Sequence, residues 1–270
     1  MTQIAEIYSQ EAAGEWRRLE IDTYRTLEFW ITMHFLRKYL PTQGLILDTG
    51  GGPGRYTLAL CREGYRMVLL DLAPGCIEFA RGQFAEEPEA VRDCLQDMLV
   101  GDIRSLPLPA EHFDATLCMG GPLSHLQQVE DRRLAVRELI RVTRPGGVVA
   151  LTGIGYLAVL RTILIECPYE LDGPHLEPFL PTGDGPGPSD MPWHFFRAAE
   201  LRELAESCGL QTLEMAGCQS LSTGLRRETN SLCQEGGPRW QRWLGLLLDT
   251  CTETAVVDMS EHILYIGRKQ

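Results

Sequence analysis

Residues Leu45–Gly54 read LILDTGGGPG. The apolar run ends in Asp48, and four glycines follow before a helical pattern begins at Arg55. This order predicts a strand that passes through a glycine turn into the N-terminus of a helix. Glycine lets the backbone approach a ligand closely, and the first N–H groups of a helix attract anionic groups. We therefore expect a nucleotide-like ligand at this turn, with a tight turn that binds nothing as the alternative.

A second strand pattern supports a nucleoside ligand. The apolar run Met67–Leu70 ends in Asp71, which follows Gly52 by 19 residues. An acid at about this distance accepts hydrogen bonds from ribose hydroxyls in dinucleotide-binding folds. The dinucleotide fingerprint G-x-G-x-x-G is incomplete, however, because Arg55 stands where its last glycine belongs. The chain also lacks a G-x-x-x-x-G-K-[ST] phosphate loop, which disfavours ATP and GTP.

The run DTGGGPG, residues 48–54, resembles motif I of the class I S-adenosylmethionine-dependent methyltransferases. Further likenesses follow in the family's order over about residues 45–153. Asp71 in VLLDLAP resembles the ribose-binding acid, and Gly101-Asp102-Ile103 resembles the adenine-binding acid with its apolar neighbour. The segment that opens at Phe113 and leads to GGPLSHL resembles the fourth strand, and RVTRPGGVVALTG, residues 141–153, resembles the helix, tight turn and fifth strand.

The resemblance implies S-adenosylmethionine as the cofactor and S-adenosylhomocysteine as the product. It places the cofactor at the glycine turn, at the ends of the second and third strands, and beside the loop after the fourth. The cofactor's carboxylate needs a donor, which the amides of the turn or Arg17 or Arg18 can supply; a solvated surface arginine is the alternative. The expected cofactor-binding residues are Arg18, Asp48, Gly50, Gly51, Gly52, Asp71, Leu72, Asp102, Ile103 and Gly120.

Candidates for catalysis are fewer. His125 follows the fourth strand, and His194 follows a proline-rich stretch in PWHFFR. Both are expected to face the cavity, and histidine is the side chain best suited to take a proton near neutral pH. The alternative for each is a surface or packing histidine. The aromatic residues beside His194 can line a substrate pocket or belong to the core.

Composition excludes several classes of function. The net charge of −12 argues against a basic groove for nucleic acid. No apolar run approaches the roughly 20 residues of a membrane span, and the polar, acidic N-terminus does not resemble a secretory signal. The nine cysteines include no C-x-x-C pair and no zinc-type spacing, so we expect no metal site. A cytoplasmic protein is expected, without a membrane or nucleic-acid partner.

Strand and helix patterns alternate along the chain. They predict a parallel sheet with helices on both faces, in which ligands sit at the carboxyl ends of the strands. The predicted elements are Leu45–Asp48, Arg55–Glu63, Met67–Asp71, Cys76–Ala85, Asp114–Met119, Asp131–Val142 and Val148–Thr152, and later Tyr156–Ile165, Ala198–Cys208, Leu213–Ala216, Trp240–Leu248 and His262–Gly267. The resemblance implies an α/β, three-layer Rossmann-like fold with a seven-stranded, mostly parallel sheet whose last strand is antiparallel.

One domain is expected over residues 1–270. Residues 1–40 are predicted as an N-terminal helical lid, with a helix from Trp16 to Leu40 that Pro41 stops; Tyr8 lies in a segment that several methyltransferases fold over the cofactor. Residues 41–153 are the cofactor-binding core, and residues 194–270 complete the sheet. Residues 154–193 are an insertion after the fifth strand, in which Pro168–Pro192 holds seven prolines and four glycines. Long connections of this kind are usually functional or disordered, and we expect a substrate-side lid.

These observations predict an enzyme that transfers a methyl group to a small molecule by in-line displacement. The protein's share of this reaction is to align the reacting atoms and exclude water. One alternative is a protein methyltransferase, since the acidic charge suits a basic protein substrate. Another is an S-adenosylmethionine-binding protein with different chemistry, because a fold does not determine its reaction. The acceptor is left open, as is the choice between monomer and homodimer.

Overall fold

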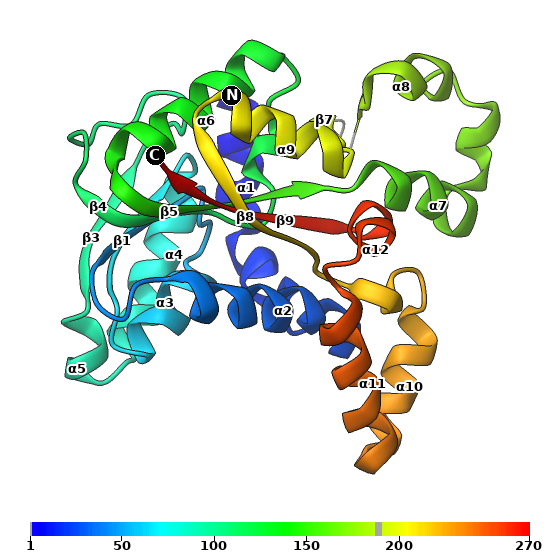
Figure 1. Ribbon diagram of the computed structural model, residues 1–270, viewed down its shortest axis with the longest axis horizontal. Helices are drawn as coiled ribbons and strands as arrows, with labels where there is room; N and C mark the ends of the chain where they lie inside the picture. Colours follow the sequence, from blue (N-terminus) through cyan, green and yellow to red (C-terminus); the bar gives the residue numbers. More distant parts are fainter. Residues whose placement is uncertain (1, 187–190) are drawn as a thin grey trace.

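The computed structural model describes residues 2–186 and 191–270. A seven-stranded sheet crosses the molecule in the order β3-β2-β1-β4-β5-β9-β8 (Figure 1). Strands β1 to β5 pair in parallel, whereas β9 is antiparallel to both β5 and β8. This confirms the predicted fold class. The strands are β1 (Leu45–Thr49), β2 (Arg66–Asp71), β3 (Leu95–Val100), β4 (Phe113–Cys118), β5 (Thr143–Ile154), β8 (Leu210–Gly217) and β9 (His262–Lys269).

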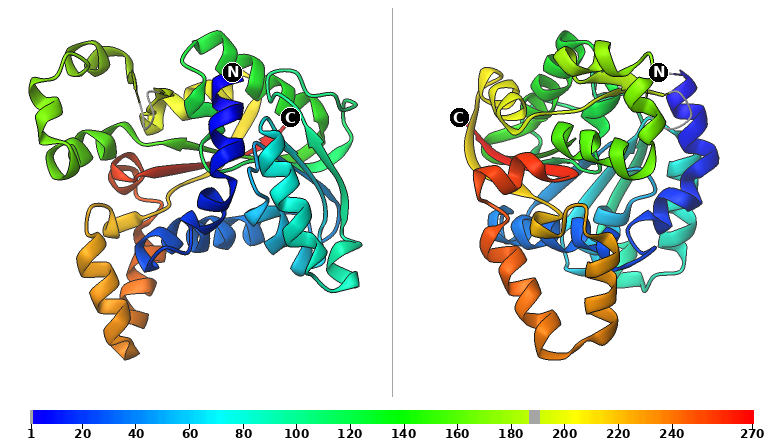
Figure 2. Two further views of the ribbon diagram at one scale, coloured as in Figure 1. Left: turned by 180° about the vertical axis from the view of Figure 1, so that it is seen from behind. Right: turned by 90° about the vertical axis from the view of Figure 1, so that its right-hand side faces the viewer.

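Helices cover both faces of the sheet, which gives three layers (Figures 1 and 2). Side chains alternate along each strand, so that Ile46 of β1 packs into one core and Leu47 into the other. The first core lies under α2 (Thr23–Tyr39), α3 (Arg55–Arg62), α4 (Pro74–Ala85) and α11 (Gly237–Thr250). The second lies under α6 (Val129–Val142) and α9 (Ala198–Ser207). Short helices α5 (Glu89–Arg92), η1 (Pro122–His125) and η4 (Ser220–Ser222) join these elements.

The N-terminal region forms two helices instead of the single helix predicted from Trp16 to Leu40. Helix α1 (Thr2–Arg18) ends before Asp22, whose side chain caps α2 by accepting the N–H of Arg25 at 2.9 Å. Because the chain turns at this break, α1 does not continue along α2 and lies against α4 (Figure 2). This change of direction brings α1 to the edge of the sheet where β1, β2 and β4 end.

The insertion after β5 contains more regular structure than its sequence predicted. It holds α7 (Tyr156–Glu166), η2 (Pro168–Asp172), α8 (Leu176–Thr182) and an antiparallel hairpin of β6 (Asp184–Pro186) and β7 (Pro192–His194). Residues 187–190 of the expected lid lie outside the described residues. Short helices and three-residue strands leave little periodicity in a sequence, so its pattern does not predict them.

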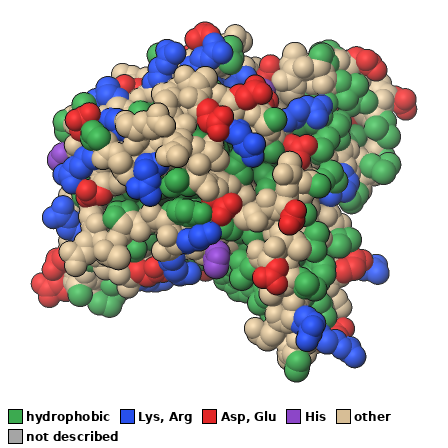
Figure 3. Space-filling model, viewed as in Figure 1, with side chains coloured by type: hydrophobic (Ala, Val, Ile, Leu, Met, Phe, Trp, Pro, Cys, Tyr) green, Lys and Arg blue, Asp and Glu red, His purple; other side chains and the backbone are tan. Residues whose placement is uncertain are grey.

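The C-terminal part contains two helices that the sequence did not reveal, α10 (Arg226–Glu235) and α12 (Thr254–Met259). Helices α10 and α11 form an arm that projects from the sheet (Figure 1). Hydrophobic side chains gather on both the insertion and the arm in Figure 3. The exposed hydrophobic residues of these segments include Leu164 and Tyr169 in the insertion and Leu246 in the arm. Within residues 2–186 and 191–270, none of the helices combines the length and apolarity that a membrane crossing requires.

Candidate active site

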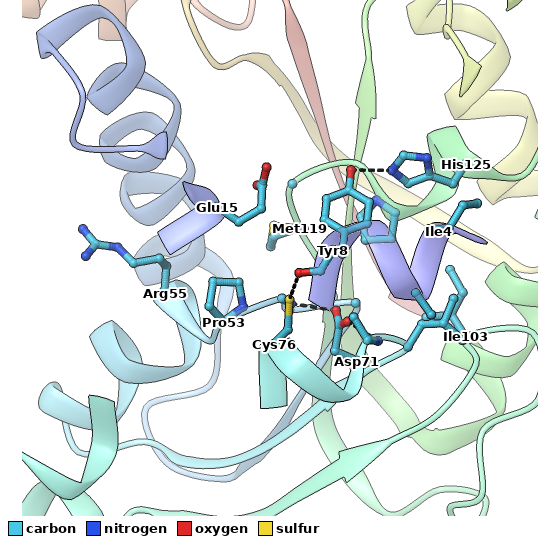
Figure 4. A pocket seen from close by; sticks show the side chains of 18 of the residues that line it. Ile4, Tyr8, Glu15, Pro53, Arg55, Asp71, Cys76, Ile103, Met119 and His125 are labelled. Atoms are coloured by element: carbon cyan, nitrogen blue, oxygen red, sulfur yellow. Dashed lines mark hydrogen bonds between the residues drawn. The ribbon is translucent and has the colours of Figure 1, made fainter. Parts of the chain in front are cut away.

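A cavity opens at the carboxyl ends of β1, β2 and β4, where the strand order reverses. It encloses about 950 Å³ of space, part of it open to solvent, and helix α1 covers it (Figure 4). Open α/β sheets bind their ligands at this position. The lining residues are Ile4, Ala5, Tyr8, Glu15, Arg18 and Leu19 from α1 and its end, Gly50–Gly52, Pro53, Arg55 and Tyr56 from the glycine turn and α3, Asp71–Ala73 and Cys76 from β2 and α4, and Asp102, Ile103, Met119, Gly120, Pro122, His125 and Leu126 from the loops after β3 and β4.

The glycine turn brings its backbone to this cavity, and two of its residues have positive φ, a conformation that favours glycine. Gly50 has φ of +60°, and a Cβ there would lie 2.5 Å from Cγ of Pro122. Gly52 has φ of +56°, and a Cβ there would meet nothing within 4 Å. Since Gly52 lines the cavity, the missing side chain leaves open space where a ligand can touch the backbone.

Asp71 ends β2 with its carboxylate buried beside the turn. Its Oδ2 accepts the N–H of Gly52 and its Oδ1 accepts the N–H of Ala73, both at 2.8 Å. Burial raises the pKa of this carboxyl group, although the two amides oppose the rise. An ionised carboxylate has about four acceptor positions, so Asp71 can hold the turn and still accept hydrogen bonds from a ligand.

Asp48 does not line the cavity, contrary to its place in the expected cofactor-binding set. It is fully buried beneath the turn, where Oδ2 accepts the hydroxyl of Thr57 at 2.6 Å. Its Oδ1 has no hydrogen-bond partner among the described residues. Burial raises the pKa of Asp48 to about 7. The sequence does not distinguish Asp48 from the turn that it supports, because the two are adjacent along the chain.

The loops after β2 and β3 bring Leu72, Asp102 and Ile103 to the cavity, as expected. Asp102 pairs with Arg104, whose Nη2 lies 2.7 Å from Oδ2. Burial opposes ionisation of Asp102, but the hydrogen bonds and charge of Arg104 outweigh it and lower the pKa of the carboxyl group. The carboxylate is therefore ionised at neutral pH and held in one orientation next to an apolar side chain.

Arg18 lines the cavity, whereas Arg17 is exposed. A Cβ at Gly120 would lie 3.7 Å from Nη2 of Arg18, so the guanidinium faces the loop after β4. Glu28 of α2 accepts two hydrogen bonds from this guanidinium, at 2.7 and 3.2 Å. Glu28 itself is buried next to His262, whose Nδ1 lies 3.3 Å from Oε2. Burial opposes ionisation of Glu28, yet the charges of Arg18 and His262 lower its pKa.

The sequence reasoning missed Glu28 and His262 because they meet only in the folded chain. Both are buried and lie on elements from opposite ends of the sequence, α2 and β9. Gln219 adds a further hydrogen bond to His262 Nδ1 at 3.1 Å. Burying the carboxylate of Glu28 costs desolvation energy, and the ion pair with Arg18 offsets this cost. The arrangement holds the Arg18 side chain in place at the cavity wall.

The structure separates the two candidate histidines. His125 lines the cavity, and its Nε2 lies 2.8 Å from the hydroxyl of Tyr8 (Figure 4). Burial lowers the pKa of His125 to about 4, so the ring is neutral at pH 7. The ring also meets Trp193 edge to face, with centroids 4.6 Å apart.

His194 does not face the cavity, and that expectation was wrong. Its Nδ1 lies 2.7 Å from Asp184 and its Nε2 lies 2.7 Å from Glu200. The side chain is almost fully buried, 1% exposed, and joins the β6–β7 hairpin to α9. Both ring nitrogens are occupied by carboxylates, so His194 connects two elements of the fold and has no nitrogen left for a substrate. In the described part of the chain, no group of three or more His, Cys, Asp and Glu is placed to hold a metal ion.

The cavity suits S-adenosylmethionine. The open space at Gly52 admits a close ligand, and the buried carboxylate of Asp71 has acceptor capacity left for ribose hydroxyls. Ile103 supplies apolar surface for a base.

Comparison with known proteins agrees with this geometry. Residues 46–147 match the family described as "Methyltransferase domain". A malonyl-[acyl-carrier protein] O-methyltransferase of Serratia marcescens is 33% identical over 137 residues, which cover 50% of this chain and 48% of that protein. A glycine N-methyltransferase of Mus musculus is 26% identical over 162 residues, which cover 56% and 54%. The chain thus spans about half the length of these curated relatives.

Solved structures extend the likeness to the whole fold. A structure described as a S-adenosylmethionine-dependent methyltransferase of Methanosarcina mazei superposes with a TM-score of 0.60 at 20% identity, covering 87% of this chain and 96% of that one. At this identity the likeness concerns the fold. Residues 46–147 therefore form a methyltransferase domain, and the matched relatives and the shared fold indicate S-adenosylmethionine as its cofactor.

Proposed function

We propose that the protein transfers a methyl group from S-adenosylmethionine to a small-molecule acceptor. The observation that carries this proposal is the cavity beneath α1, in which the backbone at Gly52 is open to a ligand and the carboxylate of Asp71 is buried beside it. When bound, the cofactor supplies a methyl group activated by a positively charged sulfur.

The residues of the cavity have distinct tasks in this proposal. Asp71 accepts hydrogen bonds from the ribose hydroxyls, and the backbone at Gly52 approaches the cofactor most closely. Asp102 and Ile103 hold the adenine. Arg18, kept in place by Glu28, pairs with the cofactor's carboxylate. Each task matches a side chain that lines the cavity or a backbone segment exposed to it.

Alignment and exclusion of water are the protein's main contributions to methyl transfer. Helix α1 is the proposed cofactor lid, because it contributes lining residues along its length and packs against α4. The insertion is the proposed cover on the acceptor side. His125 is the proposed base where the acceptor must lose a proton: its neutral ring can accept one, although its lowered pKa makes it a weak base.

Two observations favour a small acceptor over a protein. The cavity is covered by α1, and His125, the candidate base, is itself largely buried behind Tyr8 and Trp193. A protein side chain would have to enter through this cover. The names of the two curated relatives include one O- and one N-methyltransferase, so they do not select the acceptor atom.

Binding and transfer of a labelled methyl group test the proposal. Equilibrium dialysis with labelled S-adenosylmethionine measures affinity, and incubation with a metabolite extract detects transfer. Asp71→Ala is expected to weaken cofactor binding by about 10- to 100-fold, which corresponds to loss of a hydrogen bond to a charged group. Asp93→Ala, at an exposed acid outside the cavity, is the control. Unchanged affinity in Asp71→Ala removes this residue from the site.

The alternatives have their own outcomes. Label that appears on proteins of a lysate and not on metabolites supports a protein methyltransferase. Binding of the cofactor with conversion to a product other than S-adenosylhomocysteine supports different chemistry on the same fold. A chain that neither binds S-adenosylmethionine nor labels any small molecule contradicts the proposed function.

A further inference from the structure

A second cavity lies inside the insertion. It encloses about 1,420 Å³ of space, part of it open to solvent, between α7, η2, α8 and the β6–β7 hairpin. This size is sufficient for a small molecule. The lining residues are Val159, Thr162, Ile163, Glu166, Cys167, Tyr169, Glu170, His175, Leu176, Phe179, Gly185, Pro186, Trp193 and Phe195.

Aromatic rings form one continuous wall of this insertion cavity. Trp193 and Phe195 stack with centroids 5.8 Å apart, and Phe179 meets Phe195 edge to face at 5.6 Å. Behind them Tyr156 stacks on Phe179 and carries the guanidinium of Arg197 on its ring, 4.1 Å from the centroid. The aromatic cluster therefore already holds one cation, on a ring that does not line the cavity. Aromatic faces attract cations through the negative potential of the ring.

The charged residues of the insertion cavity have one sign. Its described lining contains the carboxylates of Glu166 and Glu170 and neither a lysine nor an arginine. Glu166 is the last residue of α7, and Glu170 lies in η2. Within the described residues, neither carboxylate forms a salt bridge. An anionic ligand would therefore be repelled, and a cationic one would meet both carboxylates and aromatic faces.

The insertion cavity shares a wall with the cofactor cavity. Trp193 lines the former and His125 lines the latter, and their rings are in contact. Gln127, two residues after His125, donates from Nε2 to the carbonyl oxygen of Trp193 at 3.4 Å, which ties the hairpin to the loop after β4. A molecule that fills the insertion cavity and packs on Trp193 therefore lies one ring away from His125 and the cofactor cavity.

We propose that the insertion cavity binds the methyl acceptor, and that the acceptor is a small molecule with an apolar body and an ammonium group. This inference rests on the proposed methyl transfer and adds the substrate class. The apolar body packs against Phe179, Phe195 and Trp193, and the ammonium lies at Glu166 and Glu170. An ammonium nitrogen has no lone pair, so it serves recognition, and methylation takes place at another atom that reaches past Trp193.

Calorimetry on the full chain tests the charge preference with three probes that share a naphthyl group and are similar in size. These are 1-naphthylmethylamine, which is cationic at pH 7, the neutral 1-naphthalenemethanol and the anionic 1-naphthoate. The amine is expected to bind about five- to tenfold more tightly than the alcohol, as expected for a cation–π contact combined with a partly exposed ion pair. The naphthoate is expected to bind most weakly, and added salt should reduce the preference.

Variants locate the binding. The double change Glu166→Gln and Glu170→Gln should remove the ion-pair part of the amine's preference over the alcohol and leave only the cation–π part, while Glu177→Gln, at an exposed acid of α8 outside the lining, should change nothing. Ile163→Trp fills the cavity and should weaken all three probes, with circular dichroism as the check on folding. Equal affinities of amine and naphthoate, or binding that none of the lining changes affects, overturn the inference.

The same titrations distinguish this inference from the proposed function. Binding of S-adenosylmethionine is measured for each variant, and the double glutamate variant should retain wild-type affinity because neither residue lines the cofactor cavity. A chain that binds S-adenosylmethionine but shows no preference for the amine contradicts the inference alone. A chain that prefers the amine but does not bind S-adenosylmethionine contradicts the methyl transfer.

Discussion

The hydroxyl of Tyr8 lies 2.8 Å from Nε2 of His125, and this hydrogen bond joins α1 to the loop after β4. On its other side the His125 ring contacts Trp193 of the insertion hairpin. Three segments that are far apart in the sequence therefore meet at one imidazole. Two of them are the proposed covers, α1 over the cofactor and the insertion over the acceptor.

Tyr8→Phe removes the hydrogen bond and keeps the ring. Loss of one hydrogen bond costs about 0.5–1.5 kcal/mol, so S-adenosylmethionine should bind about two- to tenfold more weakly. If the bond holds the lid closed, the loss should appear as faster dissociation, measured by stopped-flow fluorescence. Tyr39→Phe is the matched control, because its hydroxyl donates to Glu214 away from the cavity. Equal dissociation rates in wild type and Tyr8→Phe would show that the bond does not hold the lid.

Gly75→Ala tests the docking of α1 on α4. A Cβ at Gly75 would lie 2.5 Å from the carbonyl oxygen of Ser9, so α1 must move away. We expect weaker S-adenosylmethionine binding and faster proteolysis of the N-terminal segment. Gly82→Ala on the same helix is the control, since its Cβ would meet nothing within 4 Å and alanine stabilises a helix by up to about 1 kcal/mol relative to glycine. Matching proteolysis of the two variants would argue against a docked lid.

Asp48→Asn should change the pH dependence of stability. The pKa of Asp48 rises to about 7 on folding, so the folded chain binds more protons than the unfolded chain between about pH 4 and 7. The contribution of Asp48 to the free energy of unfolding therefore falls by about 4 kcal/mol in total as pH rises through that range. Urea unfolding at a series of pH values should show that the free energy of unfolding of Asp48→Asn, relative to that of the wild type, increases by about this amount as pH rises. Asp172→Asn, at an exposed site, is the control; parallel curves for Asp48→Asn and wild type contradict the raised pKa.

His125 should make the stability depend on pH in the opposite direction, and His125→Gln should remove this dependence. Burial lowers the pKa of His125 to about 4, so between about pH 4 and 6.5 the unfolded chain binds more protons than the folded one. The contribution of His125 to the free energy of unfolding is fully present above pH 6.5, and it falls by about 3 kcal/mol as pH drops to 4. Glutamine can keep a hydrogen bond to Tyr8 but cannot titrate. The wild type should therefore lose more stability than His125→Gln on acidification, with His34→Gln at an exposed position as the control.

Much of the sheet was predictable because its signals are local. The glycine turn at Gly52 and the acid Asp71 stand at the ends of short apolar runs, and periodicity identified the strands and most of the covering helices. The family resemblance added the antiparallel last strand. The position of Asp71 in the cavity required no long-range information, because β1 and β2 are neighbours in both sequence and space.

The rest depended on contacts that no local pattern contains. The break at Asp22 turns α1 toward the cavity, and its capping hydrogen bond is visible only once α2 exists. The support of Arg18 by Glu28 and His262 joins segments from both ends of the chain. His194 was assigned to the cavity from its neighbours in sequence, whereas Asp184 and Glu200 hold it elsewhere in the fold.

The most direct test of the central claim is calorimetric titration of S-adenosylmethionine into Gly52→Ala and Gly64→Ala. Both glycines have positive φ, +56° and +89°, and a Cβ at either would meet nothing within 4 Å, so each variant places alanine in an unfavourable backbone conformation without a steric clash. Only Gly52 lines the cavity; Gly64 lies in the exposed turn before β2. We predict that Gly52→Ala remains folded and loses most of its affinity, whereas Gly64→Ala binds as the wild type does. Equal affinity of the two variants would contradict a cofactor bound against the glycine turn.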